Sequence, residues 1–498
     1  MIRGVVTDSH IPWGARALLV GAAALASVFT AVPAASAGVA DPDPTFGAAG
    51  TALVPFEAEA SADALALAPD GDIVVVGRVE AAPDTRDFAI ARLNPDGSLD
   101  EDFSGDGRTT LDLAEGGDDY ATGVAVRPDG RIVVVGTSAN QFAVVQLTTT
   151  GKPDEDFAAG GSIEFGFGDE DWGHAHDVVL DAAGSAIVVG EGDSEGDGDQ
   201  DAAIARVTAS GDLDGGFAAN GRLTAGLDLP GSPSSDHAFA VALSPDGEAV
   251  IAGEHFQVPN VNGLFGRIDS SGAVQMLESL GSGRYYGARD IAVLTGGMPV
   301  AVGYYQPHGP PGGSATAWSF GESGLEAGWE HFDPEVRAQA RSIAPLSDGG
   351  AIVVGTIGPQ SNLFLLDPSS EAGFVAHAPI EFAASEVAVA DAKPVVAGST
   401  GGTFAIGRFL APTVDLPNTK IVAGPHGKVA GAKVKFRFRA DPQAAGFECK
   451  LDRGRWRPCK SPLKLGSLDR GRHRFKVRAV SGQGEHDPTP AKRRFKIA

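Results

Sequence analysis

Residues 67–107 read LAPDGDIVVVGRVEAAPDTRDFAIARLNPDGSLDEDFSGDG and contain every element of a pattern that recurs along the chain. An alternating strand ends in a Pro-Asp-Gly turn, and a β-branched run then ends at Gly77. A third strand carries FAIARL, and an Asp-x-x-Phe segment (Asp100 and Phe103) precedes a fourth short strand. Alternation and turn residues at this spacing predict four short strands joined by tight turns.

The β-branched run that ends in glycine occurs seven times, with a mean period of about 53 residues. Such a period is typical of propellers and solenoids, and no window shows the sustained helical period of α-solenoids. Four short strands repeated in series predict an all-β protein with a seven-bladed β-propeller. The last three copies are weaker, so six and eight blades remain alternatives. The seven glycines are Gly77, Gly136, Gly190, Gly253, Gly303, Gly355 and Gly398.

The two ends of the repeat array complement each other. The seventh copy has strand patterns around 386–390, 394–398 and 404–409 but lacks the Asp-x-x-Phe segment and the fourth strand. These missing parts occur at the other end, as DPTFGAAG (43–50) followed by TALVPF. We therefore expect the N-terminal strand to complete the last blade and remove a free sheet edge.

The repeats resemble the delta-60 repeat family of exported bacterial proteins. The resemblance rests on the Pro-Asp-Gly turn, the IVVVG strand, FAIARL and NPDGSLDEDFSGDG, and it covers roughly residues 43–410. It implies a propeller-like fold and a secreted or surface location, and it implies no catalytic residues. We expect each repeated Phe to pack between neighbouring blades and each Asp to cap the turn before it.

Composition and charge indicate two domains. Among 498 residues, 68 Gly and 32 Pro are too many for a helical protein, and 43% hydrophobic residues are too many for a disordered one. The net charge of −25 argues against a protein whose whole surface coats nucleic acid. Residues 418–498 nevertheless contain ten Lys and eleven Arg against six acidic residues, a net charge of +15. The preceding residues therefore carry −40, and the two parts have different partners or attract each other.

The N-terminus predicts a secreted or cell-surface protein. Arg3 and Arg16 precede or flank an apolar run at 17–32, and Ala35-Ser36-Ala37 supplies a small-residue cleavage pattern. An uncleaved membrane anchor is the alternative, although the run is short for a spanning helix. The expected organisation is a signal peptide (1–37), a seven-repeat propeller (38–410), a linker (411–419) and a basic β-sandwich domain (420–498).

The C-terminal domain predicts a disulfide-bonded β-sandwich. KVKFRFR (433–439) and RFKVR (474–478) alternate strictly, with one apolar and one basic face. Cys449 and Cys459 flank an Asp-Arg-Gly turn, so a hairpin places them opposite each other as a disulfide. FECKLDRGRWRPCKSPLKL, GRHRFKVRAV and DPTPAKRRFKI resemble the small immunoglobulin-like domains of exported actinobacterial proteins. This domain departs from the usual near-neutral versions because it is strongly basic.

The basic strand faces are the strongest interaction signal. On an exported domain they indicate binding to an anionic cell-wall polymer, an extracellular polysaccharide or lipid headgroups. Nucleic acid is a weaker candidate, because no aromatic residue lies among these cations on the basic face. A domain that contacts its own acidic propeller is an equally weighted alternative. The predicted polyanion-binding residues are Lys433, Lys435, Arg437, Arg439, Arg474, Lys476 and Arg478.

Two weaker signals concern metals. Asp197, Asp199 and Asp201 alternate in an acidic loop, a spacing that turns several oxygens toward a calcium ion, although a solvated hairpin loop is the simpler interpretation. His174 and His176 lie on one face of an extended strand, as a transition-metal pair requires, but no third ligand is evident nearby. A polar strand start is therefore the preferred interpretation of the histidines. We expect no other cofactor.

The sequence indicates a non-catalytic binding or scaffold protein rather than an enzyme. It lacks the G-x-S-x-G, H-E-x-x-H and P-loop motifs, and no cysteine lies near an activating histidine. The expected function is an exported, monomeric surface protein that presents loops to a polymer or protein partner. The alternative is a propeller glycan lyase or hydrolase whose side chains converge at one mouth of the ring. The drifted copies near Tyr285, Tyr286 and Trp329 are either a binding surface or decayed repeats.

Overall fold

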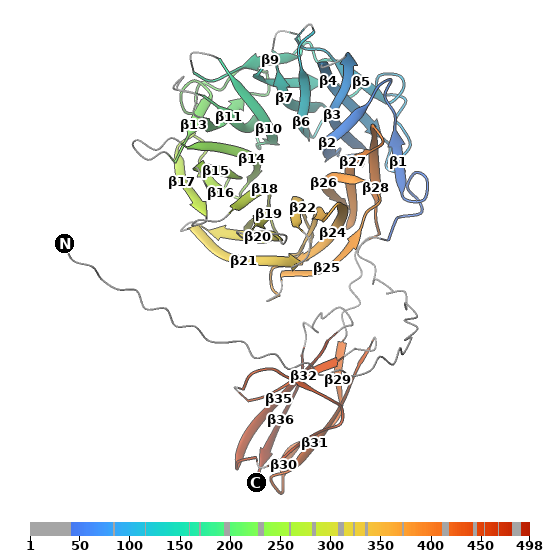
Figure 1. Ribbon diagram of the computed structural model, residues 1–498, viewed down its shortest axis with the longest axis vertical. Coiled ribbons are helices and arrows are strands. Elements are labelled where there is room, and N and C mark those ends of the chain that lie inside the picture. The colour runs from blue at the N-terminus through green and yellow to red at the C-terminus, as the bar shows by residue number, and fades with distance from the viewer. Residues whose placement is uncertain are drawn as a thin grey trace, which may run out of the picture. The chain divides into compact units, whose positions relative to one another are not determined.

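The computed structural model is all-β over the residues it describes. These are residues 41–498 except 83–84, 115, 159, 169–170, 194–199, 228–233, 258–259, 281–284, 307–312, 322–323, 334–336, 371–372, 411–417, 442–445, 453, 467 and 481–489. Residues 51–408 form seven four-stranded antiparallel units around a common axis (Figure 1). No helix long and apolar enough to cross a membrane occurs in this described part of the chain.

The first three units each follow the order of the sequence repeat. The first contains β2 (Ala60–Leu67), β3 (Ile73–Ala82), β4 (Thr85–Leu93) and β5 (Arg108–Leu111). The second contains β6 (Asp119–Val126), β7 (Ile132–Ser138), β8 (Gln141–Leu147) and β9 (Ser162–Phe165). The third contains β10 (Gly173–Leu180), β11 (Ala186–Gly192), β12 (Asp201–Val207) and β13 (Arg222–Ala225).

The next three units have longer fourth strands. The fourth contains β14 (Ser235–Leu243), β15 (Ala249–Gln257), β16 (Asn260–Ile268) and β17 (Val274–Leu280). The fifth contains β18 (Tyr285–Val293), β19 (Pro299–Gln306), β20 (Gly313–Gly321) and β21 (Gly324–Asp333). The sixth contains β22 (Ala338–Pro345), β23 (Ala351–Ile357), β24 (Gln360–Asp367) and β25 (Gly373–Pro379). A single parallel bridge, Val261 to Tyr285, joins the fourth and fifth units into one eight-stranded sheet.

The seventh unit takes one strand from the other end of the array. It contains β26 (Ala383–Ala390), β27 (Lys393–Thr400) and β28 (Thr403–Arg408). Its outer strand is β1 (Thr51–Val54), which pairs antiparallel with β28 in the register Thr51 to Gly407. The complementary sequence patterns at the two ends thus lie in one sheet.

A β-bulge recurs on the inner strand of every unit and explains the repeated glycine. The register skips one residue directly after an alanine whose partner on the second strand is that glycine. A Cβ atom on any of the seven glycines would lie only 1.8–2.1 Å from a carbonyl oxygen of the inner strand. No side chain fits there, so only glycine lets the two strands pair across the bulge.

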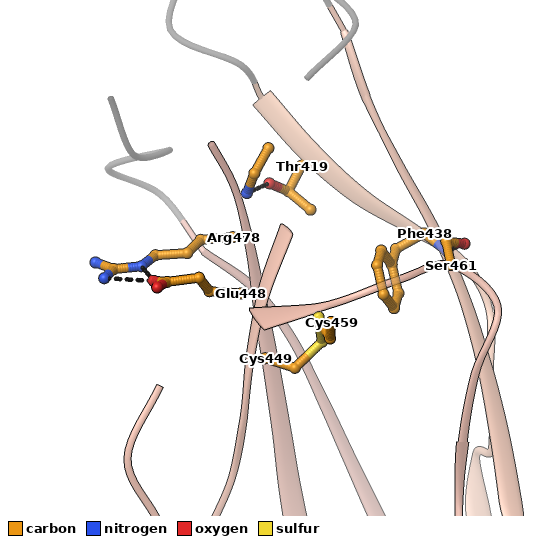
Figure 2. The surroundings of a disulfide bond; sticks show 8 residues. Thr419, Phe438, Glu448, Cys449, Cys459, Ser461 and Arg478 are labelled. Carbon is orange, nitrogen blue, oxygen red and sulfur yellow. Dashed lines mark hydrogen bonds and ion pairs between the residues drawn. A yellow bond between two sulfur atoms is a disulfide. The ribbon is translucent and has the colours of Figure 1, made fainter. Parts of the chain in front are cut away.

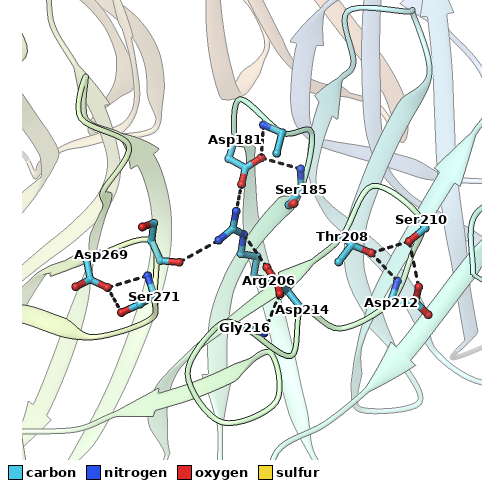
Figure 3. Close-up of polar contacts among 12 residues, drawn as sticks. Asp181, Ser185, Arg206, Thr208, Ser210, Asp212, Asp214, Gly216, Asp269 and Ser271 are labelled. Atoms are coloured by element: carbon cyan, nitrogen blue, oxygen red, sulfur yellow. Dashed lines mark hydrogen bonds and ion pairs between the residues drawn. The ribbon is translucent and has the colours of Figure 1, made fainter.

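A second recurring contact joins neighbouring units. Arg206 on β12 forms ion pairs with Asp181 and Asp214, and its Nη1 donates to the carbonyl of Ser270 in the next unit at 3.0 Å (Figure 3). Arg92 and Arg408 reach in the same way from the first and seventh units to carbonyls of the second and first. This repeated arginine therefore ties the turn of its own unit to the turn of the next.

In the Asp-x-x-Phe segments the Phe packs between units as predicted, whereas the Asp caps the turn that follows it rather than the turn before it. Oδ1 of Asp100 accepts the amide of Asp102 at 3.0 Å, which caps the turn. Phe103 is fully buried in a cluster that contains residues of both the first and the second unit. The Arg92 guanidinium lies 5.2 Å from the Phe103 ring centre, so the arginine packs on the ring that it helps to position. The equivalent rings, Phe46, Phe157 and Phe217, are also buried.

The N-terminal segment makes the same contacts across the ends of the array. Phe46 packs in one cluster with Val75 of the first unit and Ile406 of the seventh. Oδ2 of Asp43 lies 2.8 Å from Nζ of Lys393 and 2.9 Å from Nε of Arg408. These hydrogen bonds, with one from Thr45, hold the pKa of Asp43 well below its ordinary value.

The C-terminal residues form two small sheets around a shared core. One sheet contains β29 (Asn418–Ala423), β31 (Val434–Asp441) and β34 (Leu463–Leu465). The other contains β30 (Gly427–Val429), β36 (Ala491–Ile497), β35 (Gly471–Val480), β32 (Gly446–Leu451) and β33 (Arg457–Cys459). Phe436 of the first sheet stacks on Phe475 of the second at 3.9 Å between ring centres.

The predicted disulfide joins Cys449 and Cys459 (Figure 2). The two cysteines lie on the hairpin strands β32 and β33, with Cα atoms 5.8 Å apart. Their register differs from the prediction that they face each other directly. Cys449 pairs with Arg457 and Cys459 with Phe447, so the disulfide spans the hairpin diagonally.

Replacing Gly136 by alanine is expected to destabilise the fold by roughly 1–3 kcal/mol, as overpacking does in other cores. The new Cβ atom would lie 2.1 Å from the carbonyl oxygen of Tyr120, and backbone must move to accept it. Gly215→Ala is the matched control, because no atom lies within 4 Å of the Cβ position there. Urea unfolding of both variants measures the difference. Equal midpoints would contradict the steric explanation.

Asp43→Asn is expected to lower the melting temperature at neutral pH by a few degrees. A lowered carboxyl pKa stabilises the folded state above the unfolded pKa of about 4, and this contribution is lost as the pH falls through the folded pKa. The variant should therefore approach the native protein as the pH falls below about 4. Thermal unfolding against pH tests this. A melting difference that does not depend on pH would show that the ion pairs of Asp43 do not stabilise the join between β1 and β28.

Candidate functional site

Adjacent strands of the larger C-terminal sheet present cations opposite cations. Arg472 pairs with Lys496, Arg474 with Arg494, and Lys476 with Lys492 across β35 and β36. Lys476 also pairs with Lys450 on β32, so three lysines form one row. Directly opposite residues of antiparallel strands project to the same face, and like charges there destabilise the sheet. We call the surface of these seven cations the cation ladder.

No side chain of the cation ladder forms an ion pair among the described residues. Ion pairs in this domain bind Arg478 to Glu448 at 2.8 Å and His473 to Asp452 at 2.8 Å, and neither includes a residue of the ladder. Partial burial and the positive charges of Lys492, Arg474 and Lys450 lower the pKa of Lys476. The ladder therefore carries a local excess of positive charge that the described part of the domain does not neutralise.

An aromatic side chain lies at the border of the ladder. The guanidinium of Arg478 lies 4.6 Å from the centre of the Trp456 ring, and Nζ of Lys450 lies 5.9 Å from it. Figure 2 shows the Arg478–Glu448 pair on one side of the disulfide hairpin that carries this tryptophan. Trp456 is half-buried. The sheet thus offers an aromatic surface beside repeated cations, which the strand alternation alone does not indicate.

The structure divides the predicted basic residues between two sheets. The apolar residues of β31 and β35 face one shared core, so their basic residues face away from it on opposite sides. Lys435, Arg437 and Arg439 are exposed on β31, and Lys433 is exposed directly before it; Lys435 faces Lys464 and Arg439 faces Lys420. Arg474 and Lys476 belong to the cation ladder, whereas Arg478 is paired with Glu448. The basic residues that were predicted to share a single face therefore lie on two different faces of the domain.

A second group of polar side chains converges on Glu191, at one end of the inner strands of the third and fourth units. Its carboxylate lies 3.2 Å from Nδ1 of His174, 3.5 Å from Nε2 of His176 and 3.1 Å from Nδ1 of His237. Burial opposes ionisation of Glu191, but hydrogen bonds from His174 and His176 hold its pKa well below the ordinary value. Burial also lowers the pKa of His237, against the attraction of Glu191.

His174 and His176 lie at a polar strand start, as predicted, but a third histidine lies beside them. His237 on β14 supplies the third imidazole that the sequence around His174 and His176 does not show. The three nitrogens face a carboxylate rather than a shared open position, so this arrangement is a charged hydrogen-bonded cluster.

Aromatic and charged residues extend this cluster into the fifth unit. The Arg289 guanidinium lies 4.8 Å from the centre of the Phe239 ring, and Phe239 in turn packs 5.0 Å from the ring of His176. Arg289 forms an ion pair with Glu254 at 2.8 Å, and the Tyr304 hydroxyl donates to the same oxygen at 2.9 Å. Burial and the charge of Glu254 raise the pKa of Tyr304 to about 12. Arg289 keeps 39% of its side-chain surface exposed and is the accessible cation of the group.

Carboxyl groups at the bulges link inner strands of different units. Oδ2 of Asp177 accepts the amide of Val241 at 2.9 Å, and Oδ2 of Asp290 accepts the amide of Ile343 at 2.7 Å. Burial and the charge of Asp290 raise the pKa of Asp177 to about 7, and burial raises the pKa of Asp290 to about 6. Burial and the same neighbouring charges also raise the pKa of Glu386. Part of this group is therefore protonated near neutral pH.

Sequence reasoning missed most residues of both groups. In the ladder it missed the β36 cations Lys492, Arg494 and Lys496, although AKRRFKI alternates as clearly as the strands that it used. In the Glu191 cluster it missed the partners that come from other repeats. Aligning the seven inner strands on the shared alanine before the bulge would have shown that the positions beside it vary and are often polar.

The remaining predicted metal site is only partly described. Asp197 and Asp199 lie outside the described residues, and Asp201 begins β12. In the drifted fifth unit, Tyr286 stacks on Tyr305 at 4.8 Å between ring centres, and Trp329 packs against the buried core between the fifth and sixth units.

Three segments of the chain match a family model described as "Domain of unknown function (DUF5122) beta-propeller". The matched residues are 68–103, 127–157 and 184–217. Each match starts near the turn before the second strand and ends at or near the buried Phe of the Asp-x-x-Phe segment. The first three repeats are thus similar in sequence to the repeats of this propeller family. No curated protein has a significant sequence match to this chain.

Several solved structures are similar to this chain over much of its length. The extracellular domain assigned to the hybrid two component system BT4673 of B. thetaiotaomicron is 10% identical, with 88% of this chain and 69% of that chain covered and a TM-score of 0.31. The Cps50 (Swd1) β-propeller domain of Myceliophteria thermophila is 9% identical, with 72% and 98% covered and a TM-score of 0.42. The polysaccharide lyase Uly1 is 10% identical, with 70% and 89% covered and a TM-score of 0.42. At these identities the similarity concerns the fold alone.

The raised pKa values of the bulge carboxyls predict that the free energy of unfolding falls as the pH rises from about 5 to about 8. A raised carboxyl pKa stabilises the folded state fully below the unfolded pKa of about 4, and this contribution is lost as the pH rises through the folded pKa. Asp177→Asn should reduce the fall in melting temperature over this range, and Asp102→Asn, an exposed control, should not. Thermal unfolding at several pH values measures both slopes. Identical slopes in Asp177→Asn and the native protein would contradict the assignment.

Proposed function

We propose that this chain is an exported protein that binds an anionic extracellular polysaccharide through the cation ladder of β36, β35 and β32. The observation that carries the proposal is the set of three cross-strand pairs of like charge, Arg472–Lys496, Arg474–Arg494 and Lys476–Lys492. Such pairs weaken a sheet on its own. A polymer with repeated negative charges would neutralise them all at once.

The geometry of the ladder suits a linear polymer. Alternate residues of a strand lie about 6.7 Å apart on one face, and neighbouring strands lie about 4.8 Å apart. The cations therefore repeat along two directions of one flat surface. Trp456, beside Lys450 and Arg478, offers a ring face on which a sugar ring can stack. The export signal and the Cys449–Cys459 disulfide favour an extracellular polysaccharide over nucleic acid.

The finer description of the fold is part of the same proposal. The pairing of β1 with β28 and the Asp43 ion pairs support a seven-bladed delta-60 propeller that is closed by its N-terminal strand. The two C-terminal sheets around a common core support an immunoglobulin-like sandwich. We place the protein outside the cell or at its surface, as a monomer.

A glycan lyase or hydrolase is the second candidate, and the Glu191 cluster favours it. Three imidazoles, two buried carboxylates, a tyrosine and an exposed arginine gather at one end of the inner strands. Perturbed pKa values in such a group are typical of functional sites. In that case Arg289 would hold an acidic sugar, and the neutral His237 would exchange a proton with it.

The test measures binding of the purified full chain to polygalacturonate, to purified cell wall and to double-stranded DNA over a range of salt concentrations. The double variant Lys476→Glu/Arg494→Glu should weaken polysaccharide binding by on the order of tenfold or more at low salt. The matched control Lys435→Glu/Arg437→Glu changes the net charge equally on the other sheet and should retain most of the binding.

The outcomes are distinct. Equal losses in both variants would show non-specific attraction by net charge, and tighter binding to DNA than to either polymer would contradict the polysaccharide assignment. If the native protein binds none of these three polymers, attraction between the basic domain and its own acidic propeller remains as the explanation of the positive charge. The same incubations, followed by ultraviolet absorbance for unsaturated uronate ends and by reducing-end assays, test the enzyme alternative. The enzyme alternative would be established if the native protein forms product and the Arg289→Ala variant does not.

A further inference from the structure

Three aspartates meet at the border between the first and second units. Asp87 is on β4, Asp112 directly follows β5, and Asp119 begins β6. Each contributes a carboxylate oxygen, and these oxygens all lie within 4.8 Å of one another. Among the described residues, this is the one group in which three or more His, Cys, Asp or Glu side chains bring their potential ligand atoms so close together.

Asp119 is fully buried, and one of its oxygens lacks a partner. Its Oδ2 accepts the amides of Leu113 at 2.7 Å and Ala114 at 3.1 Å. Its Oδ1 has no hydrogen-bond partner in the described part of the chain. Ser138 lies directly opposite Asp119 on β7, is equally buried, and its Oγ also has no described partner. Two unpaired buried oxygens at neighbouring positions point to a missing electropositive group.

The fourth unit has a different partner at this place. Asp236 is the equivalent of Asp119, and its Oδ2 accepts the amide of Leu227 at 2.9 Å in the same way. Its Oδ1, however, lies 2.8 Å from Nδ1 of His255, the residue opposite it on β15. The second unit has Ser138 where the fourth has His255. The serine side chain is too short to replace the imidazole, and two further carboxylates, Asp87 and Asp112, surround the position instead.

The electrostatics of the group agree with a bound cation. Asp87, Asp112 and Asp119 bring three carboxyl groups together at this border, and their negative charges repel one another. Repulsion of this kind is relieved when a divalent ion lies between the carboxylates.

We propose that Asp87, Asp112 and Asp119 bind a calcium ion at the border of the first two units. Calcium takes oxygen ligands at about 2.4 Å, so one ion can contact oxygens up to about 4.8 Å apart. Magnesium requires near-ideal octahedral geometry and usually keeps several waters, so a group of three protein carboxylates suits calcium better. Asp112 is exposed, and it gives the ion access from solvent. The ion would join β4 and β5 of one unit to β6 of the next.

The experiment follows calcium binding by the full chain after treatment with a chelator, using isothermal titration and thermal unfolding. Calcium should raise the melting temperature of the native protein, and magnesium should do so less at the same concentration. Asp112→Asn should weaken calcium binding by on the order of tenfold or more. This variant is chosen because Asp112 is exposed and its replacement does not disturb the core, whereas Asp119→Asn changes a buried group.

Two control variants make the outcome decisive. Asp118→Asn replaces the exposed neighbour of Asp119, which pairs with Arg86 outside the group, and should bind calcium as the native protein does. Asp199→Asn tests the acidic loop of the third unit and should also retain the binding. The proposal is overturned if calcium does not stabilise the native protein, if Asp112→Asn binds as tightly as Asp118→Asn, or if only Asp199→Asn loses the ion.

Discussion

The contact between a glycine and the carbonyl of a bulged inner strand is the constraint on which the seven units depend. In every unit the Cβ position of this glycine is taken by a backbone oxygen. The glycine must therefore recur even where the rest of the repeat has drifted, as at Gly303 and Gly398. The bulge that it accommodates turns the adjacent residue out of the regular alternation. Those residues include His176, Phe239 and Arg289, which form much of the Glu191 cluster.

Contacts between units follow a second rule, which is less uniform. The first, third and seventh units use an arginine that binds its own Asp-x-x-Phe aspartate and the turn of the next unit. In the second unit Gln146 binds Asp154, and Arg127 reaches the next turn instead. In the fourth to sixth units the segment is absent and the fourth strand is longer. Direct strand pairing there replaces the loop, which explains why the fifth and sixth copies look weak in the sequence.

The strands, their order and the disulfide hairpin were predictable because local chemistry determines them. Pro-Asp-Gly turns, β-branched runs and strict alternation have one structural meaning each, and all agree over 67–107. The Glu191 cluster was not predictable in the same way. His174 and His237 are far apart in sequence and meet only because the inner strands of adjacent units lie side by side. For the basic residues, the exposure was predictable but the distribution over two sheets was not. Alternation shows which residues are exposed but not which strands share a sheet.

The sequence by itself determined the repeat and the separation of a basic segment from an acidic one. These features follow from patterns within a few tens of residues, because steric limits and charge there depend on the local sequence alone. Tertiary structure alone decided that β35 joins β36 and β32 rather than β31, so that cations meet cations across one sheet. It also decided that Asp87, Asp112 and Asp119 share one border. Strand pairing and the packing of units depend on contacts between distant segments, and no local pattern records which distant segment a strand will meet.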